Sequence, residues 1–597
     1  MRIWQIVTNV QRGQTAGRKA LVRPVLVAMC LLPMGCNGEA EPTVRMVAGD
    51  RIQRVAAVAP DFQLASASGK YLAGRLARRS RDFDSAAALL SDALSLDPDN
   101  SRIRRQAFFS LVASGRIVDA VPLAREIIEE NAGAPIANLT LAVEDADAGR
   151  FEAAEARLTN MPQRGMNSFT TPLLVAWLSF ARGDVEKAVT ALDGLSKMAS
   201  FAALRNLHTG LIRDLAGNPQ AAEAALAEAA KGTDSLRVVQ AYGRFLERAG
   251  RAAEAKTVYE AYIAKNEESD TLLPALERIA AGKQPPRLVS TAKEGMAEVL
   301  FNLAGTLAQG RSTDLALMYG RLALRLRPDF PLAQVLLGGM LEALDRKVEA
   351  LALYDGVNPA SSFAWSARLR RAATLDELER TEEAIAELRR MAAERTDRAD
   401  ALIRLGDLLR AKKRFEEAVQ AYSEAIARIG GLSKNDWSLL YARGVAYERS
   451  QQWPKAESDF LRALELSPEQ PFVLNYLGYS WVDQGKFLDR AREMIERAVQ
   501  LRPNDGYIVD SLGWVLYRLG DYRGAAEKLE RAVTLRPDDP TINDHLGDAY
   551  WRIGRVLEAR FQWRRALSLD PEKADIPQIE KKLRQGIADA PTKDRRS

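Results

Sequence analysis

The side chains most often used in catalysis are scarce in this chain. Its two histidines, His208 and His545, lie far apart in the sequence. We find no His-Glu-x-x-His zinc motif, no phosphate-binding glycine loop, no Cys-x-x-Cys pair and no Gly-x-Ser-x-Gly nucleophile elbow. Acidic residues are plentiful, but they stand at helix-surface spacing, where each can pair with Arg or Lys four positions away. We therefore expect no catalytic, metal-binding or cofactor-binding residues, and we expect His545 to pack within the fold rather than act as a base or a ligand.

Cys36 is the residue whose surroundings predict a covalent modification. Residues 1–23 carry five cations and no acid, and an apolar run at 24–34 precedes a Gly-Cys pair that ends with Cys36. A basic segment followed by a short apolar run is typical of an export signal, and a membrane span would need roughly 20 apolar residues. The pair resembles the lipobox of bacterial lipoproteins, which implies acylation of Cys36. Cleavage after Ala40, which leaves a soluble periplasmic chain, and an uncleaved start are the alternatives.

The predicted lipid anchor also bears on location. Asn37 follows Cys36, whereas lipoproteins retained at the inner membrane carry an aspartate there. The resemblance therefore implies an outer-membrane lipoprotein that faces the periplasm and meets the membrane through its N-terminal anchor only. Cys30 lies within the export signal, so the mature chain has no pair of cysteines for a disulfide.

The charge of the mature chain is balanced. Five of the 84 basic residues lie in residues 1–23, and the remaining 79 equal the 79 acidic residues. A nucleic-acid-binding protein normally shows a net basic field or stripe. Local clusters such as Arg564-Arg565 are expected to be solvated helix faces. We therefore expect no nucleic-acid partner.

Small residues recur at a nearly fixed interval in the last third of the chain. Gly444, Gly478, Gly513 and Gly547 follow one another at this interval, and each precedes two alanines and a proline at nearly constant offsets. Small side chains let two antiparallel helices approach closely, and large ones such as Phe460 fill the remaining space. The proline ends the second helix because it has no N–H to donate. A period of about 34 residues with this frame is similar to the tetratricopeptide repeat.

The frame can be followed back to the N-terminal part of the chain and gives fourteen units. The predicted fold is therefore an all-α tetratricopeptide solenoid, a superhelical array of about fourteen helix pairs, each packed against its neighbours. We call the first position of the frame in each unit its slot. The slot holds glycine or alanine in every unit except the second, where it holds phenylalanine. The fourteen slots are Gly74, Phe108, Ala142, Ala176, Gly210, Gly243, Ala304, Gly338, Ala372, Gly406, Gly444, Gly478, Gly513 and Gly547.

One interval departs from the period. Gly243 and Ala304 stand closer together than two full periods would place them, and Pro285-Pro286 between them excludes helix. We predict an irregular seam there, which is either a flexible hinge or a tightly packed connector. The predicted organisation is an export signal at 1–35, a tether at 36–60, an N-terminal repeat block at 61–282, the seam at 283–290, a C-terminal repeat block at 291–572, and a capping helix with a basic tail at 573–597.

The first helix of each pair lines the concave groove in tetratricopeptide arrays. Side chains three residues before and one, four and five residues after the slot tend to face that groove. In the last repeats these positions hold aromatic, Arg, Asn and Asp side chains, which suit a peptide-binding surface. The alternative is that they form core between repeats, as we expect for Trp481 and Trp563. The predicted groove residues are Tyr441, Asn475, Tyr479, Asp510, Trp514, Tyr517, Arg518, Asp544, Asp548, Trp551 and Arg552.

Three runs in the C-terminal block carry a closer resemblance. Residues 475–479, 510–520 and 544–551 resemble the large tetratricopeptide lipoproteins of Gram-negative bacteria. The chain is similar to the outer-membrane adaptor that binds a periplasmic carboxyl-terminal processing protease and helps it degrade peptidoglycan hydrolases. The resemblance implies protein partners, namely that protease and its substrates.

The sequence thus predicts a non-enzymatic scaffold of the bacterial envelope that holds protein partners in its groove. Two other functions stay open. The first is a scaffold for envelope biogenesis, such as polysaccharide export, secretion or pilus assembly. The second is an enzyme acting on a groove-bound carbohydrate, which would need a pair of carboxylates at glycosidase distance.

Overall fold

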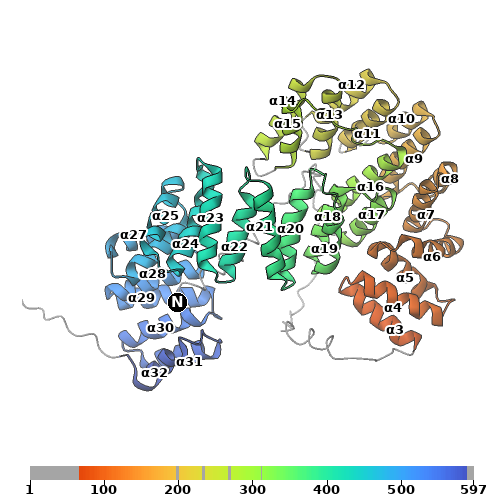
Figure 1. Ribbon diagram of the computed structural model, residues 1–597. Helices are drawn as coiled ribbons and strands as arrows, with labels where there is room; N and C mark the ends of the chain where they lie inside the picture. Colours follow the sequence, from red (N-terminus) through yellow and green to blue (C-terminus); the bar gives the residue numbers. More distant parts are fainter. Residues whose placement is uncertain (1–65, 197–200, 232–234, 267–269, 311, 588–597) are drawn as a thin grey trace, which may run out of the picture. The chain divides into compact units, whose positions relative to one another are not determined.

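The computed structural model describes residues 66–196, 201–231, 235–266, 270–310 and 312–587. Within these ranges the chain forms thirty α-helices and no β-strand (Figure 1). The prediction of an all-α array of helix pairs is confirmed. The predicted export signal, the lipid-attachment residue Cys36, the tether and the end of the basic tail lie outside the described residues.

The helices fall into two compact units that divide between Thr381 and Glu382. We call the described residues before this point the N-terminal unit and those after it the C-terminal unit. The N-terminal unit contains the 3-10 helix η2 (Asp270–Leu272) and the α-helices α3 (Ala67–Arg79), α4 (Phe83–Leu96), α5 (Ser101–Ser114), α6 (Ile117–Glu130), α7 (Pro135–Asp147), α8 (Phe151–Thr159), α9 (Asn167–Ala181), α10 (Val185–Asp193), α11 (Ala202–Leu215), α12 (Pro219–Ala230), α13 (Leu236–Arg248), α14 (Ala252–Lys265), α15 (Leu273–Ala280), α16 (Ala292–Gln309), α17 (Thr313–Leu326), α18 (Pro331–Ala343), α19 (Lys347–Asp355) and α20 (Ala364–Glu377).

The C-terminal unit follows the same plan and ends with a single helix. It contains the 3-10 helix η3 (Lys434–Asp436) and the α-helices α21 (Thr381–Glu394), α22 (Asp400–Ala411), α23 (Phe415–Ile429), α24 (Trp437–Arg449), α25 (Trp453–Leu466), α26 (Pro471–Asp483), α27 (Leu488–Leu501), α28 (Gly506–Leu519), α29 (Tyr522–Leu535), α30 (Pro540–Arg552), α31 (Val556–Ser568) and α32 (Ile576–Gln585).

Each predicted slot lies in the first helix of a pair, and a second helix follows it in the chain. Close approach of the two helices explains the glycines. A Cβ on Gly243 would lie 2.2 Å from the Tyr259 ring, and a Cβ on Gly547 would lie 2.5 Å from the Trp563 ring. Each of these large residues follows its glycine at the same offset, so the period of the sequence places bulk on one helix opposite space on the other. Trp481 and Trp563 are fully buried, as predicted.

The seam at 283–290 is an irregular segment packed onto the N-terminal unit. Leu288 and Val289 are buried in the core of that unit. Arg287 of the seam approaches Asp214, at the end of α11, with Nε 3.5 Å from a carboxylate oxygen. Arg327 donates a hydrogen bond to the Leu288 carbonyl at 3.3 Å. These contacts are those of a packed connector.

After the seam the chain turns back onto the first repeats. Helix α16 packs along α9, and α17 packs against α5 and α7 (Figure 1). Arg325 of α17 forms ion pairs with Glu144 at 2.6 Å and Asp147 at 3.0 Å, and Lys293 of α16 approaches Asp147 at 3.3 Å. Since α5, α7 and α9 are first helices, whose inner faces line the groove of such an array, α16 and α17 fill the groove of the first repeats.

The observed units therefore differ from the predicted blocks at 61–282 and 291–572. Helices α16 to α20 belong with the first repeats, and the division falls well beyond the seam, at 381. Apolar burial supplies the reason. Leu139, Val143 and Leu173 face inward from α7 and α9 and are buried, and leaving such side chains in water would cost about 1.5–3 kcal/mol each.

Candidate partner-binding surface

The structure places most of the predicted groove residues inside the C-terminal unit. Arg518 is exposed, and Tyr517, Trp551 and Arg552 are half-buried. The seven that are buried are Tyr441, Asn475, Tyr479, Asp510, Trp514, Asp544 and Asp548. Their positions therefore correspond to core between repeats, and four of the eleven side chains reach solvent.

Aromatic packing accounts for the burial at the start of this surface. Tyr441 of α24 packs edge-on against Tyr476 of α26, with ring centroids 5.7 Å apart, and against Phe460 of α25 at 6.0 Å. Burial raises the pKa of the Tyr441 hydroxyl well above its usual value. Asn475 and Tyr479 lie on the same helix as Tyr476 and are 2% and 3% exposed. These side chains pack α24 against α26, and little of their surface is exposed to a partner.

A stack of flat side chains joins α28 to α30. The ring of Trp514 lies on the imidazole of His545, with centroids 4.2 Å apart and planes 17° apart, and on the ring of Tyr517 at 5.0 Å and 10°. His545 Nδ1 lies 2.9 Å from an Asp510 carboxylate oxygen. Both His545 and Asp510 are buried. His545 packs within the array, as predicted, because its ring bridges a carboxylate and an indole.

The last helix covers the inner face of the last repeat. Lys582 of α32 places its Nζ 2.9 Å from Asp544 and 2.7 Å from Asp548. Trp551 donates its indole N–H to the Ile587 carbonyl at 3.0 Å, and Trp563 donates to Asp548 at 2.9 Å. Three of the predicted groove positions of α30, Asp544, Asp548 and Trp551, are therefore covered by the chain itself.

The charges of this cluster are two buried carboxylates and one ammonium. Burial raises the pKa of Asp548, and the neighbouring Asp544 carboxylate raises it further. Burial lowers the pKa of Lys582, but Asp548 and Asp544 outweigh that effect, and the net pKa is raised. Lys582 thus keeps its proton, which both carboxylates need as a counter-charge.

The accessible remainder lies where α26, α28 and α30 end. Arg518 stands 3.6 Å from Asp483, and Arg552 donates from Nε to the Tyr517 hydroxyl at 3.3 Å. The Arg552 guanidinium also lies over the Tyr522 ring, 5.7 Å from its centroid. We call Asp483, Tyr517, Arg518, Tyr522 and Arg552 the aromatic–arginine ledge.

The ledge combines two kinds of side chain that can bind a peptide. Guanidinium groups bind carboxylates with two parallel hydrogen bonds, and phenol rings offer stacking area. Tyr517 stacks on the buried ring of Trp514, which connects the ledge to the core of the C-terminal unit.

Tyr517, Arg518 and Arg552 of the ledge are among the predicted groove residues, whereas Asp483 and Tyr522 are not. Asp483 stands at the same offset from the Gly478 slot as Arg518 does from Gly513, so the same rule of spacing could have found it. Tyr522 begins a second helix, and a rule for first helices does not reach it.

The N-terminal unit holds a buried polar network that sequence reasoning missed. Trp177 of α9 donates its indole N–H to His208 Nδ1 at 3.0 Å. Arg237 of α13 donates from Nε to Glu298 of α16 at 2.7 Å, and neither side chain is more than 9% exposed. Burial lowers the pKa of His208 to about 4, although the Glu298 charge acts in the opposite direction. Burial alone would raise the pKa of Glu298, but Arg237 lowers it below its usual value.

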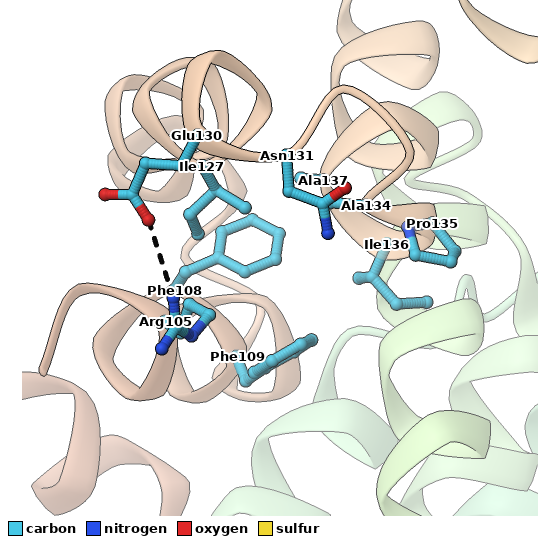
Figure 2. Close-up of a pocket in the computed structure, with 10 residues that line it drawn as sticks. All are labelled: Arg105, Phe108, Phe109, Ile127, Glu130, Asn131, Ala134, Pro135, Ile136 and Ala137. Carbon is cyan, nitrogen blue, oxygen red and sulfur yellow. Dashed lines mark hydrogen bonds and ion pairs between the residues drawn. The ribbon is translucent and has the colours of Figure 1, made fainter. Parts of the chain in front are cut away.

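A small apolar pocket lies between α5, α6 and α7 and encloses about 210 Å³ (Figure 2). Phe108, Phe109, Ile127 and Ile136 line it, and the Arg105 and Glu130 side chains meet at its rim. A pocket of this size and lining could hold one apolar side chain.

The part of the chain that the structure describes lacks two further features. It contains no group of three or more His, Cys, Asp or Glu side chains arranged to hold a metal ion. None of its helices is long and apolar enough to span a membrane.

Comparison with known proteins identifies the repeats. The sequence matches tetratricopeptide repeat families at residues 77–139, 369–433, 437–470, 477–540 and 511–574. The TPR repeat-containing protein PA4667 of Pseudomonas aeruginosa is 31% identical over 185 residues, which are 31% of this chain and 30% of that protein. The chain thus matches under a third of that relative's length.

Two solved structures show distant similarity. A tetratricopeptide repeat protein of Parabacteroides merdae is 15% identical with a TM-score of 0.36, and the match covers 42% of this chain and 97% of that one. A chain of the Cut9–Hcn1 hetero-tetramer of APC/C is 14% identical with a TM-score of 0.36, and the match covers 88% of this chain and 97% of that one.

Proposed function

We propose that this chain, which carries tetratricopeptide repeats, is a non-enzymatic scaffold in the bacterial cell envelope. In this proposal it brings a periplasmic carboxyl-terminal processing protease together with cell-wall hydrolases that the protease degrades. The repeats support binding of protein partners in general. The envelope location and the protease rest on the N-terminal sequence and on the resemblance of the C-terminal repeats.

The aromatic–arginine ledge carries the proposal for where a partner binds. The groove of the first repeats is filled by α16 and α17, and the inner face of α30 is covered by α32 through Lys582. Arg518, by contrast, is exposed, and its nearest carboxylate, Asp483, is 3.6 Å away. An ion pair at that distance between exposed groups is weak, so a carboxylate of a bound peptide can replace Asp483 at little cost.

The mechanism is proximity. A scaffold that holds a protease and its substrate at the same time converts their encounter into an intramolecular event with a high effective concentration. No chemistry by the scaffold is required. The protease cleaves faster because the entropy loss of bringing the two chains together has already occurred on binding to the scaffold.

The test is affinity capture from solubilised envelopes with the mature chain as bait, followed by mass spectrometry and by direct binding of each captured protein in purified form. Arg518→Glu reverses the charge of the ledge. Arg523→Glu makes the same change on an exposed arginine at the outer face of α29 and serves as the control.

We expect a periplasmic protease or a cell-wall hydrolase to bind the parent and the Arg523→Glu control, and to be lost with Arg518→Glu. Equal binding by all three would contradict the ledge as the binding surface. Direct binding of export, secretion or pilus components in place of the protease would contradict the adaptor proposal and select a scaffold for envelope biogenesis.

A further inference from the structure

Two large apolar side chains protrude from the second helix of the last repeat. Leu557 is 80% exposed and Phe561 is 63% exposed, and they stand one turn apart on α31. Helix α31 lies beside α32 at the end of the C-terminal unit (Figure 1). Single exposed apolar residues are common on protein surfaces, whereas this pair also departs from the pattern of the preceding repeats.

The preceding repeats differ from the last one at these two positions. The positions that Leu557 and Phe561 hold relative to the Gly547 slot are also exposed in the four preceding repeats. There they hold polar side chains or proline, with no large apolar residue. The four pairs are Glu416 and Gln420 in α23, Pro454 and Ser458 in α25, Asp489 and Glu493 in α27, after allowance for one inserted residue, and Arg523 and Glu527 in α29.

The charge on the outer face of α31 also differs from that of α29, the second helix of the preceding repeat. Arg564 and Arg565 follow on α31, both are exposed, and neither forms an ion pair with any residue that the structure describes. In α29 the position equivalent to Arg564 holds Glu530, which pairs with Arg555 at 2.7 Å. The acidic residue of α31, Glu558, also forms an ion pair with Arg555, at 3.1 Å. The outer face of α31 therefore presents two apolar side chains beside two cations without a counter-charge.

We propose that the outer face of α31, defined by Leu557, Phe561, Arg564 and Arg565, docks onto the surface of an anionic lipid membrane. Apolar side chains enter the boundary between headgroups and acyl chains, and nearby arginines bind the anionic headgroups. A protein partner suits the face less well, because a stable protein interface covers about 800 Å² on each side and two side chains on one convex helix offer far less. This contact is separate from the ledge and from the predicted lipid anchor.

The test is co-sedimentation with vesicles, using the chain from Asn37 onward, which carries neither the apolar run nor an acyl group. One set of vesicles contains phosphatidylglycerol and phosphatidylethanolamine, and the other contains phosphatidylcholine alone. Leu557→Glu/Phe561→Glu removes the apolar pair, and Arg564→Glu/Arg565→Glu reverses the charge. Val348→Glu is the matched control, because Val348 holds the register position of Leu557 in the Gly338 repeat and is 68% exposed.

We expect the parent and Val348→Glu to bind the phosphatidylglycerol vesicles more tightly than the phosphatidylcholine vesicles, and added salt to weaken that binding. Each double variant should bind about ten-fold less tightly or not at all. A parent that fails to bind phosphatidylglycerol vesicles, or double variants that bind them as well as the parent, would overturn the proposal. Circular dichroism of each variant checks that the repeats stay folded. Binding of an acidic protein to this face in the absence of vesicle binding would also overturn it.

Discussion

Gly295 of α16 lies directly against the indole ring of Trp177 of α9. A Cβ on this glycine would stand 2.2 Å from Trp177 Cδ2, which is closer than any real contact allows. The two residues are far apart in the sequence, and their contact brings the seventh repeat into the groove of the first ones. This contact, with the ion pairs of Arg325 and Lys293, explains why a groove that could hold a partner is filled by the chain itself.

Gly295→Ala should loosen α16 from α9, because the added methyl group must displace a buried indole. We expect a loss of about 1–3 kcal/mol in the free energy of opening this region, measured by hydrogen exchange of the α9 and α16 peptides. Gly305→Ala on the same helix is the control. A Cβ there meets nothing within 4 Å, so we expect no loss, or a gain of up to about 1 kcal/mol from helix propensity. Equal effects of the two changes would contradict the packing described for Gly295.

His208 should make the same region sensitive to acid. Its pKa falls from 6.5 to about 4 on burial, so the unfolded state binds a proton more readily than the folded state between these values. The stability is therefore full above pH 6.5 and is lost as the pH falls toward 4, by at most about 3 kcal/mol. Hydrogen exchange of α9 and α11 at pH 7 and pH 4.5, corrected for intrinsic rates, measures the loss.

His208→Asn supplies the comparison for that experiment. Its side-chain oxygen can accept the Trp177 hydrogen bond, but it does not titrate. The variant should be less stable at pH 7, since it loses the ring's packing, yet show a smaller change between the two pH values. The same pH dependence in parent and variant would assign the effect to another group.

Lys582→Met should release α32. The change leaves Asp544 and Asp548 buried without their counter-charge, and breaking a buried ion pair on one side typically costs about 3–5 kcal/mol. We expect faster proteolysis after Arg552 and loss of protection in α32. Lys581→Met, on the neighbouring exposed lysine, should leave both unchanged. If the two variants are cleaved alike, Lys582 does not hold the helix.

Trp514→Ala should mainly lower the stability of the fold, and any effect on partner binding should follow from that loss. The indole is 7% exposed and lies between His545 and Tyr517, and truncation of a buried tryptophan costs about 3–5 kcal/mol. Phe561→Ala, on an exposed ring, should change the denaturation midpoint little, by less than about 0.5 kcal/mol. A fully stable Trp514→Ala variant would show that the stack is not part of the core.

The helix pairs could be predicted because their cause is local. A glycine such as Gly243 and its partner Tyr259 belong to one helix pair. The contact that packs the two helices together therefore lies within one repeat, and its residues recur with the period. The same holds for Trp563, which packs against Gly547 of its own repeat. Three residues of the ledge, Tyr517, Arg518 and Arg552, are among the predicted groove residues for the same reason, since they stand at fixed offsets from their slots.

The burial of the other groove residues could not be predicted, because an offset says which way a side chain points and not what lies in front of it. Asp544 points inward as expected, and Lys582 of the last helix covers it. Trp177 points into the groove of the first repeats and meets Gly295 there. The period of the sequence thus determined which helices pair and which faces turn inward. The tertiary structure alone decided which of those faces the chain covers with its own helices, because that choice depends on the fit of surfaces far apart in the sequence.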